Sequence, residues 1–212
     1  MSSLEHGREP LGPALLAVAR ASIENGLRCG MPLAVDPRDF PPALGAPGAS
    51  FVTLRIDGAL RGCVGSVEPC RPLVVDVAQN AFAAANRDPR FPPLRRDEAA
   101  GVELHVSILA PTEPIRFRSE RELLTALEPG VHGLWIAAGP ARATFLPQVW
   151  EQLPEPAEFL DRLLEKAGIP PDLPCEAWEA ARYTVDELAG PLVARGFAEA
   201  ARRRPIDRAR GR

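Results

Sequence analysis

Hydrophobic residues recur at two spacings along the chain, and each spacing predicts a different kind of element. A three-to-four-residue spacing, which lets a helix bury one face, predicts helices at residues 12–26 and 72–86. A two-residue alternation, typical of a half-buried strand, predicts a strand at residues 102–109. Further strands are expected at 51–56, 59–67, 134–137 and 181–185, and further helices at 120–127 and 156–167.

A tight hairpin is predicted in the first half of the chain. Asp57-Gly58 stands between the strands at 51–56 and 59–67 and supplies the positive dihedral angles that a two-residue turn needs. The preceding segment, 31–50, contains five prolines and is expected to be a long ordered loop, because proline lacks the backbone donor that helices and sheets use. The return strand of the hairpin carries the sequence Leu60-Arg-Gly-Cys-Val-Gly65.

This return strand holds the residues with the clearest chemical potential. Because side chains alternate along a strand, Arg61, Cys63 and Gly65 are expected on one face. A nearby guanidinium favours the thiolate form of a cysteine, so Arg61 would prepare Cys63 as a nucleophile. Gly62 and Gly65 weaken a strand interior, which is typical of a place where a ligand or another backbone approaches closely. The alternative is that Cys63 is a small buried residue and that the glycines serve packing.

A cysteine nucleophile normally needs a base, and the sequence offers His6, His105 and His132. His6 lies in a predicted tail. His105 lies on the polar face of its strand and would face Cys63 if that strand paired with the return strand of the hairpin. His132 lies in a glycine-flanked turn that would enter a pocket. For each histidine, a structural hydrogen bond is the competing role.

Five other polar residues are candidates for binding a ligand. Asn80 lies beside the apolar stripe of the helix at 72–86. Asp88 and Arg90 follow in a loop, where they bind a polar ligand or pair with each other as a clasp, and the clasp is favoured. Arg142 and Gln148 fit either a pocket wall or a loop anchor.

Composition and charge exclude several classes of function. The net charge of −3 and the pI near 5.7 give no reason to expect nucleic acid as a partner, and the short Arg-rich tail is expected to be frayed and solvated. No two cysteines have the spacing of a structural zinc site, so no metal or other cofactor is predicted. Neither a signal peptide nor an apolar run of about 18 residues occurs, which predicts a cytoplasmic protein that does not enter the membrane.

Several motifs together resemble a known family. They are Leu60-Arg-Gly-Cys-Val-Gly65, Asn80-Ala-Phe-Ala-Ala84, Asp88-Pro-Arg-Phe91, Gly130-Val-His-Gly133 and Thr144-Phe-Leu-Pro-Gln-Val149. In content and order they resemble the AMMECR family, over residues 14–188. The resemblance implies an α+β fold: an antiparallel β-sheet flanked by helices, with a larger and a smaller lobe and a cleft between them that holds the LRGC-type strand. It implies one AMMECR-type domain at 10–190, with 191–212 as a C-terminal extension.

The family pattern also singles out individual residues. Val64 stands where isoleucine is commoner, and His105 stands where the family is variable, which weakens a mechanism through His105. His132 fits the family loop better. The pattern falls on Arg61, Gly62, Cys63, Gly65, Asp88, Arg90, Phe91, Gly133, Leu146 and Pro147.

The resemblance also implies a pathway and two rival functions. Bacterial and archaeal proteins like this are often encoded beside a Memo-like protein and a radical SAM protein, as protein A of a set called the AmmeMemoRadiSam system. The leading hypothesis is a cleft enzyme, or a modification partner, that uses Cys63 as thiolate with help from Arg61 and from His132 or His105. The alternative is a non-catalytic adaptor that binds a partner protein or a peptide in the cleft, with Cys63 inert. The expected ligand is a small molecule or a peptide.

Overall fold

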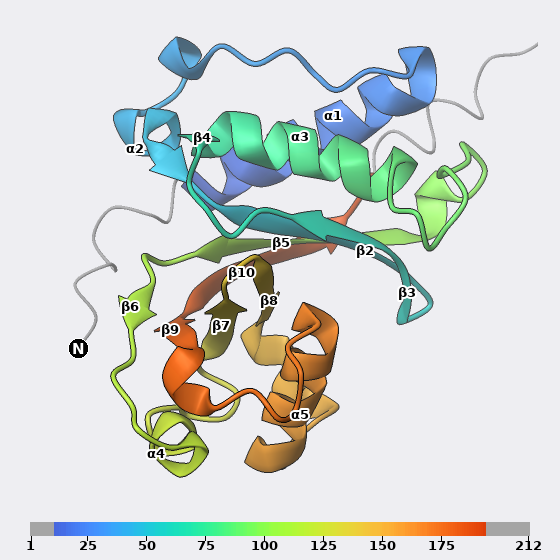
Figure 1. Ribbon diagram of the computed structural model, residues 1–212. Coiled ribbons are helices and arrows are strands. Elements are labelled where there is room, and N and C mark those ends of the chain that lie inside the picture. Colours follow the sequence, from blue (N-terminus) through green and yellow to red (C-terminus); the bar gives the residue numbers. More distant parts are fainter. Residues whose placement is uncertain (1–10, 194–212) are drawn as a thin grey trace, which may run out of the picture. The chain divides into compact units, whose positions relative to one another are not determined.

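A computed structural model describes residues 11–193 of the chain (Figure 1). The predicted tail around His6 and most of the Arg-rich extension at 191–212 lie outside these residues. The chain divides into two compact units, which we call unit 1 (residues 1–106 and 188–212) and unit 2 (residues 107–187). Helices and antiparallel sheets occur in both, so the predicted α+β class is confirmed.

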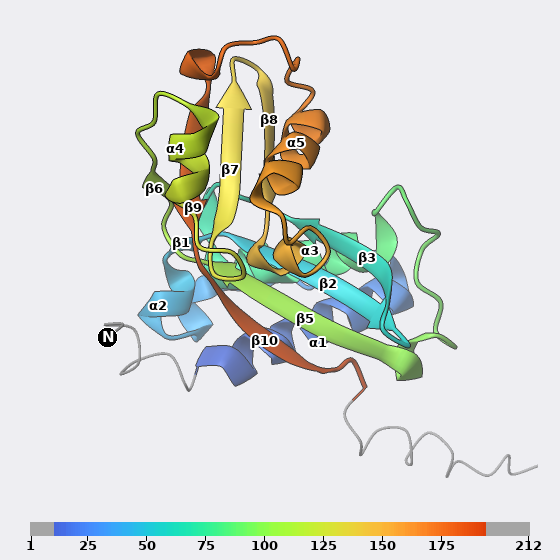
Figure 2. The ribbon, with the colours of Figure 1, turned by 90° about the horizontal axis from the view of Figure 1, so that it is seen from below.

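Unit 1 is built on a four-stranded sheet with the order β10-β5-β2-β3. Figures 1 and 2 show α1 and α3 together on one face of this sheet. The strands are β2 (Ser50–Ile56), β3 (Ala59–Gly65), β5 (Val102–Leu109) and β10 (Val185–Pro191), and the helices are α1 (Leu11–Cys29) and α3 (Leu73–Asn86). Short elements complete the unit: η1 (Pro37–Asp39), α2 (Pro42–Gly45), β1 (Pro47–Gly48), which pairs with β4 (Arg71–Pro72), and η2 (Ala99–Gly101).

The two long helices of unit 1 bury the stripes that their sequences predict. In α1 the residues Leu15, Ala19 and Ile23 are completely buried, at the spacing of one helical face. In α3 the same is true of Val77 and Ala81. The helices predicted at 12–26 and 72–86 are therefore confirmed, and each is slightly shifted or lengthened at its ends. The predicted loop at 31–50 is interrupted by η1, α2 and β1.

The predicted hairpin is present, but its return strand is irregular. Asp57 and Gly58 have positive φ angles of 51° and 79°, as a two-residue turn requires. In the β2–β3 ladder Arg55 lies opposite Leu60, whereas Leu54 lies opposite Gly62. Arg61 is thus the extra residue of a β-bulge, which interrupts the alternation of side chains along the strand.

Unit 2 contains a second antiparallel sheet, with the order β6-β9-β7-β8. Its strands are β6 (Glu113–Pro114), β7 (Gly133–Ala138), β8 (Ala141–Phe145) and β9 (Glu179–Tyr183). Its helices are α4 (Glu120–Thr125), η3 (Pro147–Glu151), α5 (Pro156–Ala167) and η4 (Cys175–Ala177). The helix α5 ends where the sequence predicts, because Gly168 adopts the left-handed conformation that terminates helices.

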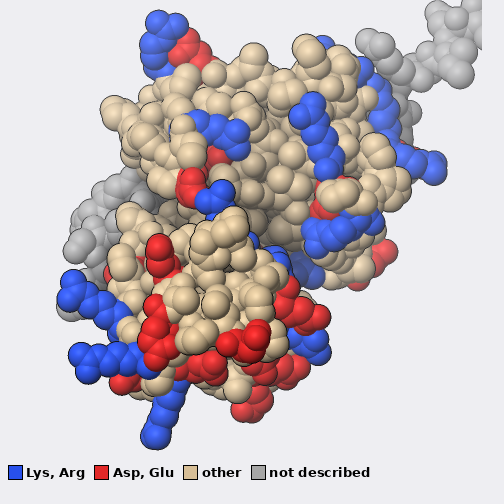
Figure 3. Space-filling model, viewed as in Figure 1, with Lys and Arg blue, Asp and Glu red and all other residues tan. Residues whose placement is uncertain are grey.

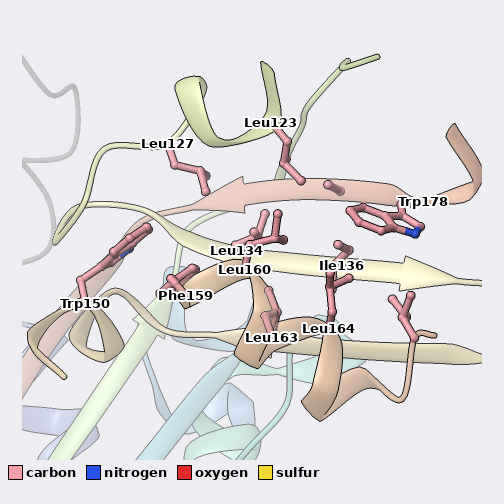
Figure 4. Packing of buried hydrophobic residues seen from close by; sticks show 12 residues of the cluster. Leu123, Leu127, Leu134, Ile136, Trp150, Phe159, Leu160, Leu163, Leu164 and Trp178 are labelled. Atoms are coloured by element: carbon pink, nitrogen blue, oxygen red, sulfur yellow. The ribbon is translucent and has the colours of Figure 1, made fainter. Parts of the chain in front are cut away.

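The core of unit 2 is a cluster of large apolar side chains from its helices and sheet (Figure 4). Leu134 and Ile136 of β7 are completely buried, as are Phe159 and Leu163 of α5. The ring of Trp150 stacks on that of Phe159 with centroids 3.7 Å apart. Unit 2 therefore has a hydrophobic core of its own.

Two strand predictions need correction. The single last strand predicted at 181–185 is two strands, β9 and β10, that are interrupted at Thr184. In β5 the alternation that buries Val102, Leu104 and Val106 does not continue, because Ser107 and Leu109 are buried and Ile108 is only half-buried. The change falls where the chain passes from unit 1 into unit 2.

We predict that Gly62→Ala destabilises unit 1, because a Cβ at this position would lie 2.2 Å from the backbone oxygen of Ala84 in α3. The atoms that this Cβ would meet belong to the backbone of a helix and cannot move aside as the end of a flexible side chain can. The free energy of unfolding should therefore fall by at least about 2 kcal/mol. Urea unfolding followed by circular dichroism measures this. Gly101→Ala is the matched control, since its Cβ would meet only Ile56 Cγ2 at 3.8 Å and should change stability by less than about 0.5 kcal/mol. Equal effects of both changes would contradict the prediction.

Candidate functional site

The candidate site centres on Cys63, in the edge strand β3 of unit 1. Cys63 lies opposite Thr53 of β2, and the Thr53 hydroxyl donates a hydrogen bond to the Cys63 sulfur over 3.3 Å. The backbone N–H of Cys63 points the other way and donates to Asp88 Oδ2 over 2.8 Å. The backbone carbonyl of Cys63 accepts from Arg90 Nη2 over 3.2 Å. Both backbone groups of this edge residue therefore bind side chains of a neighbouring loop.

Asp88 and Arg90 also bind each other. Arg90 Nη2 lies 2.7 Å from Asp88 Oδ2 and Arg90 Nε lies 2.9 Å from Asp88 Oδ1. The backbone N–H of Arg90 donates to Asp88 Oδ1 as well. We call this pair, together with its two bonds to Cys63, the Asp88–Arg90 clasp. Bonding to Arg90, and then to the backbone N–H groups of Cys63 and Arg90, holds the pKa of the buried Asp88 carboxyl well below its usual range.

Arg61 does not take the position beside the thiol that alternation predicts. Its guanidinium makes a bidentate pair with Glu98, with Nε–Oε1 and Nη2–Oε2 distances of 2.8 and 3.0 Å. It also donates to the carbonyls of Pro92 and Pro93. The bulge accounts for the difference, because it places Arg61 outside the regular pairing. The guanidinium that binds Cys63 is that of Arg90.

The two glycines of the motif lie against other parts of the same unit. Gly62 faces the backbone of α3 at Ala84, and a Cβ on Gly65 would lie 2.3 Å from the ring of Phe51. The close approach expected at these positions is thus made by the chain itself. The same contacts show that Cys63, one residue from Gly62, lies on the opposite side of β3 from α3.

Asn80 lies in a buried polar network that the spacing of residues along its helix does not predict. Its Nδ2 donates to Asp76 Oδ2 over 2.8 Å and to the Ser50 carbonyl over 3.0 Å. Asp76 is 1% exposed and also accepts from the hydroxyls of Ser50 and Ser66 and from Arg71 Nε. The available signal was an aspartate inside the apolar stripe of a helix, since a buried carboxylate needs several donors.

The two candidate histidines have other surroundings. In the sheet order, β2 lies between β5 and β3, so the pairing that would bring His105 to face Cys63 is absent. His105 Nε2 lies 3.5 Å from Glu103 Oε1. His132 belongs to unit 2, where its Nδ1 accepts from the Glu128 N–H over 2.9 Å. Burial, followed by the charge of Arg182, lowers the pKa of His132, in keeping with a neutral ring in a structured turn.

The remaining candidates also lie in unit 2. Arg142 is exposed on β8, opposite Ala137 of β7. Gln148 lies in η3, and its Nε2 donates to Glu187 Oε2 over 2.7 Å. This bond fits the loop-anchor alternative better than a ligand-binding role. None of the bonds of Gln148 involves the residues around Cys63.

Comparison with known proteins identifies the family. The family model described as AMMECR1 matches residues 16–188, most of the chain. The chain belongs to the AMMECR1 family. A protein of Methanothermobacter thermautotrophicus is 40% identical over 76% of this chain and 84% of its own length. A protein of Methanopyrus kandleri is 34% identical over 89% of this chain and 95% of its own length. A protein of Thermotoga maritima is 39% identical over 70% of this chain and 82% of its own length.

A solved structure extends the likeness to three dimensions. The crystal structure of an uncharacterized protein from Pyrococcus horikoshii matches with a TM-score of 0.75 at 33% identity, covering 83% of this chain and 89% of that one. The fold of this chain is thus similar to that of the Pyrococcus horikoshii protein. Within residues 11–193 no three or more His, Cys, Asp or Glu side chains are grouped to hold a metal ion. No helix in the same range is long and apolar enough to cross a membrane.

The Arg61–Glu98 pair predicts a specific acid response. Bonding to Arg61 lowers the pKa of Glu98 from 4.5 to about 2. A carboxylate with a depressed folded-state pKa stabilises the fold above its unfolded value, and this contribution is lost as the pH falls from 4.5 towards 2. In Glu98→Gln the free energy of unfolding should therefore be reduced at pH 7, and the gap to the parent protein should narrow over that range.

Urea unfolding at several pH values measures this gap. Asp97→Asn is the matched control, because Asp97 and its partner Arg95 are both exposed and such a pair contributes little. A gap between Glu98→Gln and the parent protein that stays constant down to pH 2 would contradict the assignment.

Proposed function

We propose that Cys63 is the reactive centre of this AMMECR1-family protein, either as the nucleophile of an enzyme or as the site of a modification. The observation that carries the proposal is the hydrogen bond from the Thr53 hydroxyl to the Cys63 sulfur, on a residue whose backbone is fixed on both sides by the Asp88–Arg90 clasp. Cys63 as a residue is half-buried, so part of it stays in contact with solvent. A fixed and partly exposed thiol is the arrangement that cysteine chemistry uses.

Each contact has a defined part in this chemistry. A hydroxyl that donates to sulfur stabilises the charged form of a thiol. Arg90, whose charge is paired with Asp88, holds the backbone of the same residue in position. The thiol proton leaves to solvent. The sulfur then forms a bond with an electrophilic carbon, and the leaving group departs with the bonding electron pair. In this proposal Thr53 takes the place of Arg61 beside the sulfur, and solvent takes the proton that a histidine base would have accepted.

We further propose that the reaction belongs to a pathway with a Memo-like protein and a radical SAM protein. The support is the resemblance of the chain to protein A of the AmmeMemoRadiSam set, whose three proteins are often encoded beside one another. The rival is the adaptor, in which Cys63 is inert and the protein binds a partner without chemistry. The reactivity of Cys63 separates the two.

Cys175 provides an internal reference for that reactivity. Both cysteines are half-buried, but burial, followed by the charges of Glu176 and Glu120, raises the pKa of the Cys175 thiol. Because the thiolate is the reacting form, iodoacetamide at pH 7.5 should alkylate Cys63 at least about fivefold faster than Cys175. Peptide mass spectrometry of the folded protein over time measures both rates in one sample.

The Thr53→Val variant tests the cause of this difference. It keeps the shape of the side chain and removes the donor, so the alkylation rate of Cys63 should fall at least about twofold while that of Cys175 stays unchanged. Thr125→Val is the control, since the Thr125 hydroxyl bonds only within its own helix, to the Arg121 carbonyl. If Cys63 reacts no faster than Cys175 in the parent protein, the thiol proposal fails and the adaptor takes its place.

A further inference from the structure

A pocket of about 410 Å³ opens on unit 1, beside α3. This volume lies within the range of small-molecule sites, about 300–1,000 Å³. Its wall comes from three segments of the chain: the loop after α1, the short strand β4, and the helix α3. The lining residues are Pro32, Arg71, Gln79, Asn80, Phe82, Ala83 and Arg87.

The pocket follows one stripe of α3. Gln79, Ala83 and Arg87 are spaced four residues apart and so lie one above another on the helix surface. At 1.5 Å per residue, Gln79 and Arg87 are about 12 Å apart along the helix. The small methyl group of Ala83 lies between them. The middle of the stripe is therefore apolar, and Gln79 and Arg87 make its two ends polar.

One end of the pocket holds a guanidinium in a fixed position. Arg71 Nε donates to Asp76 Oδ1 over 2.8 Å, and Arg71 Nη1 donates to Gln79 Oε1 over 2.5 Å. Its third nitrogen, Nη2, has only a long contact of 3.4 Å, with Asn80 Oδ1. Asp76 is buried and bound by four donor residues, so it anchors Arg71 firmly. Arg71 is therefore oriented before any ligand arrives, and one of its nitrogens is weakly used.

The other end holds the guanidinium of Arg87. Arg87 lies over the ring of Phe82, with 4.9 Å between its Cζ and the ring centroid. Among the residues that the structure describes, no carboxylate lies within ion-pair distance of Arg87. A guanidinium on an aromatic face keeps its planar edge of N–H donors available for an oxyanion. Figure 3 shows basic side chains over α3 on either side of a surface of uncharged residues.

We propose that this pocket binds a small elongated molecule with an oxyanionic group, a carboxylate or a phosphate, at each end. Arg87 binds one anionic group through its free edge, and Arg71 Nη2 with the Gln79 amide binds the other. The body of the molecule lies over Ala83, between Pro32 and Phe82. None of the lining residues belongs to the Asp88–Arg90 clasp. Binding at this pocket is therefore a separate proposal, which does not depend on the chemistry of Cys63.

Two matched pairs of probes test the proposal on the intact protein by isothermal titration calorimetry. Fructose 1,6-bisphosphate and fructose 6-phosphate differ by one phosphate, and glutarate and butyrate differ by one carboxylate. In each pair one probe carries an anionic group at both ends, and we call it the two-headed probe. In at least one pair the two-headed probe should bind with a Kd below about 1 mM. It should also bind about tenfold more tightly than its partner, because it gains a charge-assisted bond at the second end. The pair that responds tells whether the site takes phosphates or carboxylates.

Arg87→Gln should abolish the advantage of the two-headed probe. This change leaves no carboxylate without a partner among the described residues, whereas a change of Arg71 would expose the buried Asp76. Arg95→Gln, which removes the same charge from an exposed pair with Asp97, should keep the advantage within about twofold. No binding of either two-headed probe, equal binding within both pairs, or the same loss in both variants would overturn the proposal.

Discussion

The Asp88–Arg90 clasp is the interaction on which the candidate site depends. Cys63 lies in an edge strand, so its N–H and C=O point away from the sheet and have no strand to pair with. Asp88 accepts from the N–H, Arg90 donates to the C=O, and the two side chains bind each other. The side chains of Asp88 and Arg90 thus make the two hydrogen bonds that a residue of a neighbouring strand would otherwise make. The arrangement blocks the edge at this point and fixes the backbone that carries the thiol.

The rest of the LRGC motif can be understood from the same strand. Arg61 stands at a bulge and binds Glu98 and two proline carbonyls, which attaches the strand to the loop at 92–98. Gly62 lets the backbone of α3 come close, and Gly65 leaves room for Phe51. Three of these residues therefore hold β3 in place by contacts of their own. The side chain of Cys63 makes one such contact, the bond that its sulfur accepts from Thr53 of β2.

Local patterns in the sequence predicted the long elements but not how they assemble. The hairpin at Asp57-Gly58 and the end of α5 at Gly168 follow from backbone preferences of single residues, and both are confirmed. The bulge at Arg61 depends on pairing with β2, and the order of the strands depends on long-range packing, so neither is encoded in local spacing. For that reason the sequence placed Arg61 beside Cys63, and His105 there only if its strand paired with the return strand, whereas the structure places Arg90 and Thr53 at Cys63.

Amide hydrogen exchange of Cys63 tests the clasp most directly. The N–H of this edge residue is bonded only to a side chain, so its protection reports on the Asp88 carboxylate. We expect Asp88→Asn, which keeps the size of the side chain but removes its charge, to speed exchange of the Cys63 amide at least about tenfold. Exchange of the Val52 amide in β2 should stay unchanged. An unprotected Cys63 amide in the parent protein, or equal rates in both proteins, would contradict this expectation.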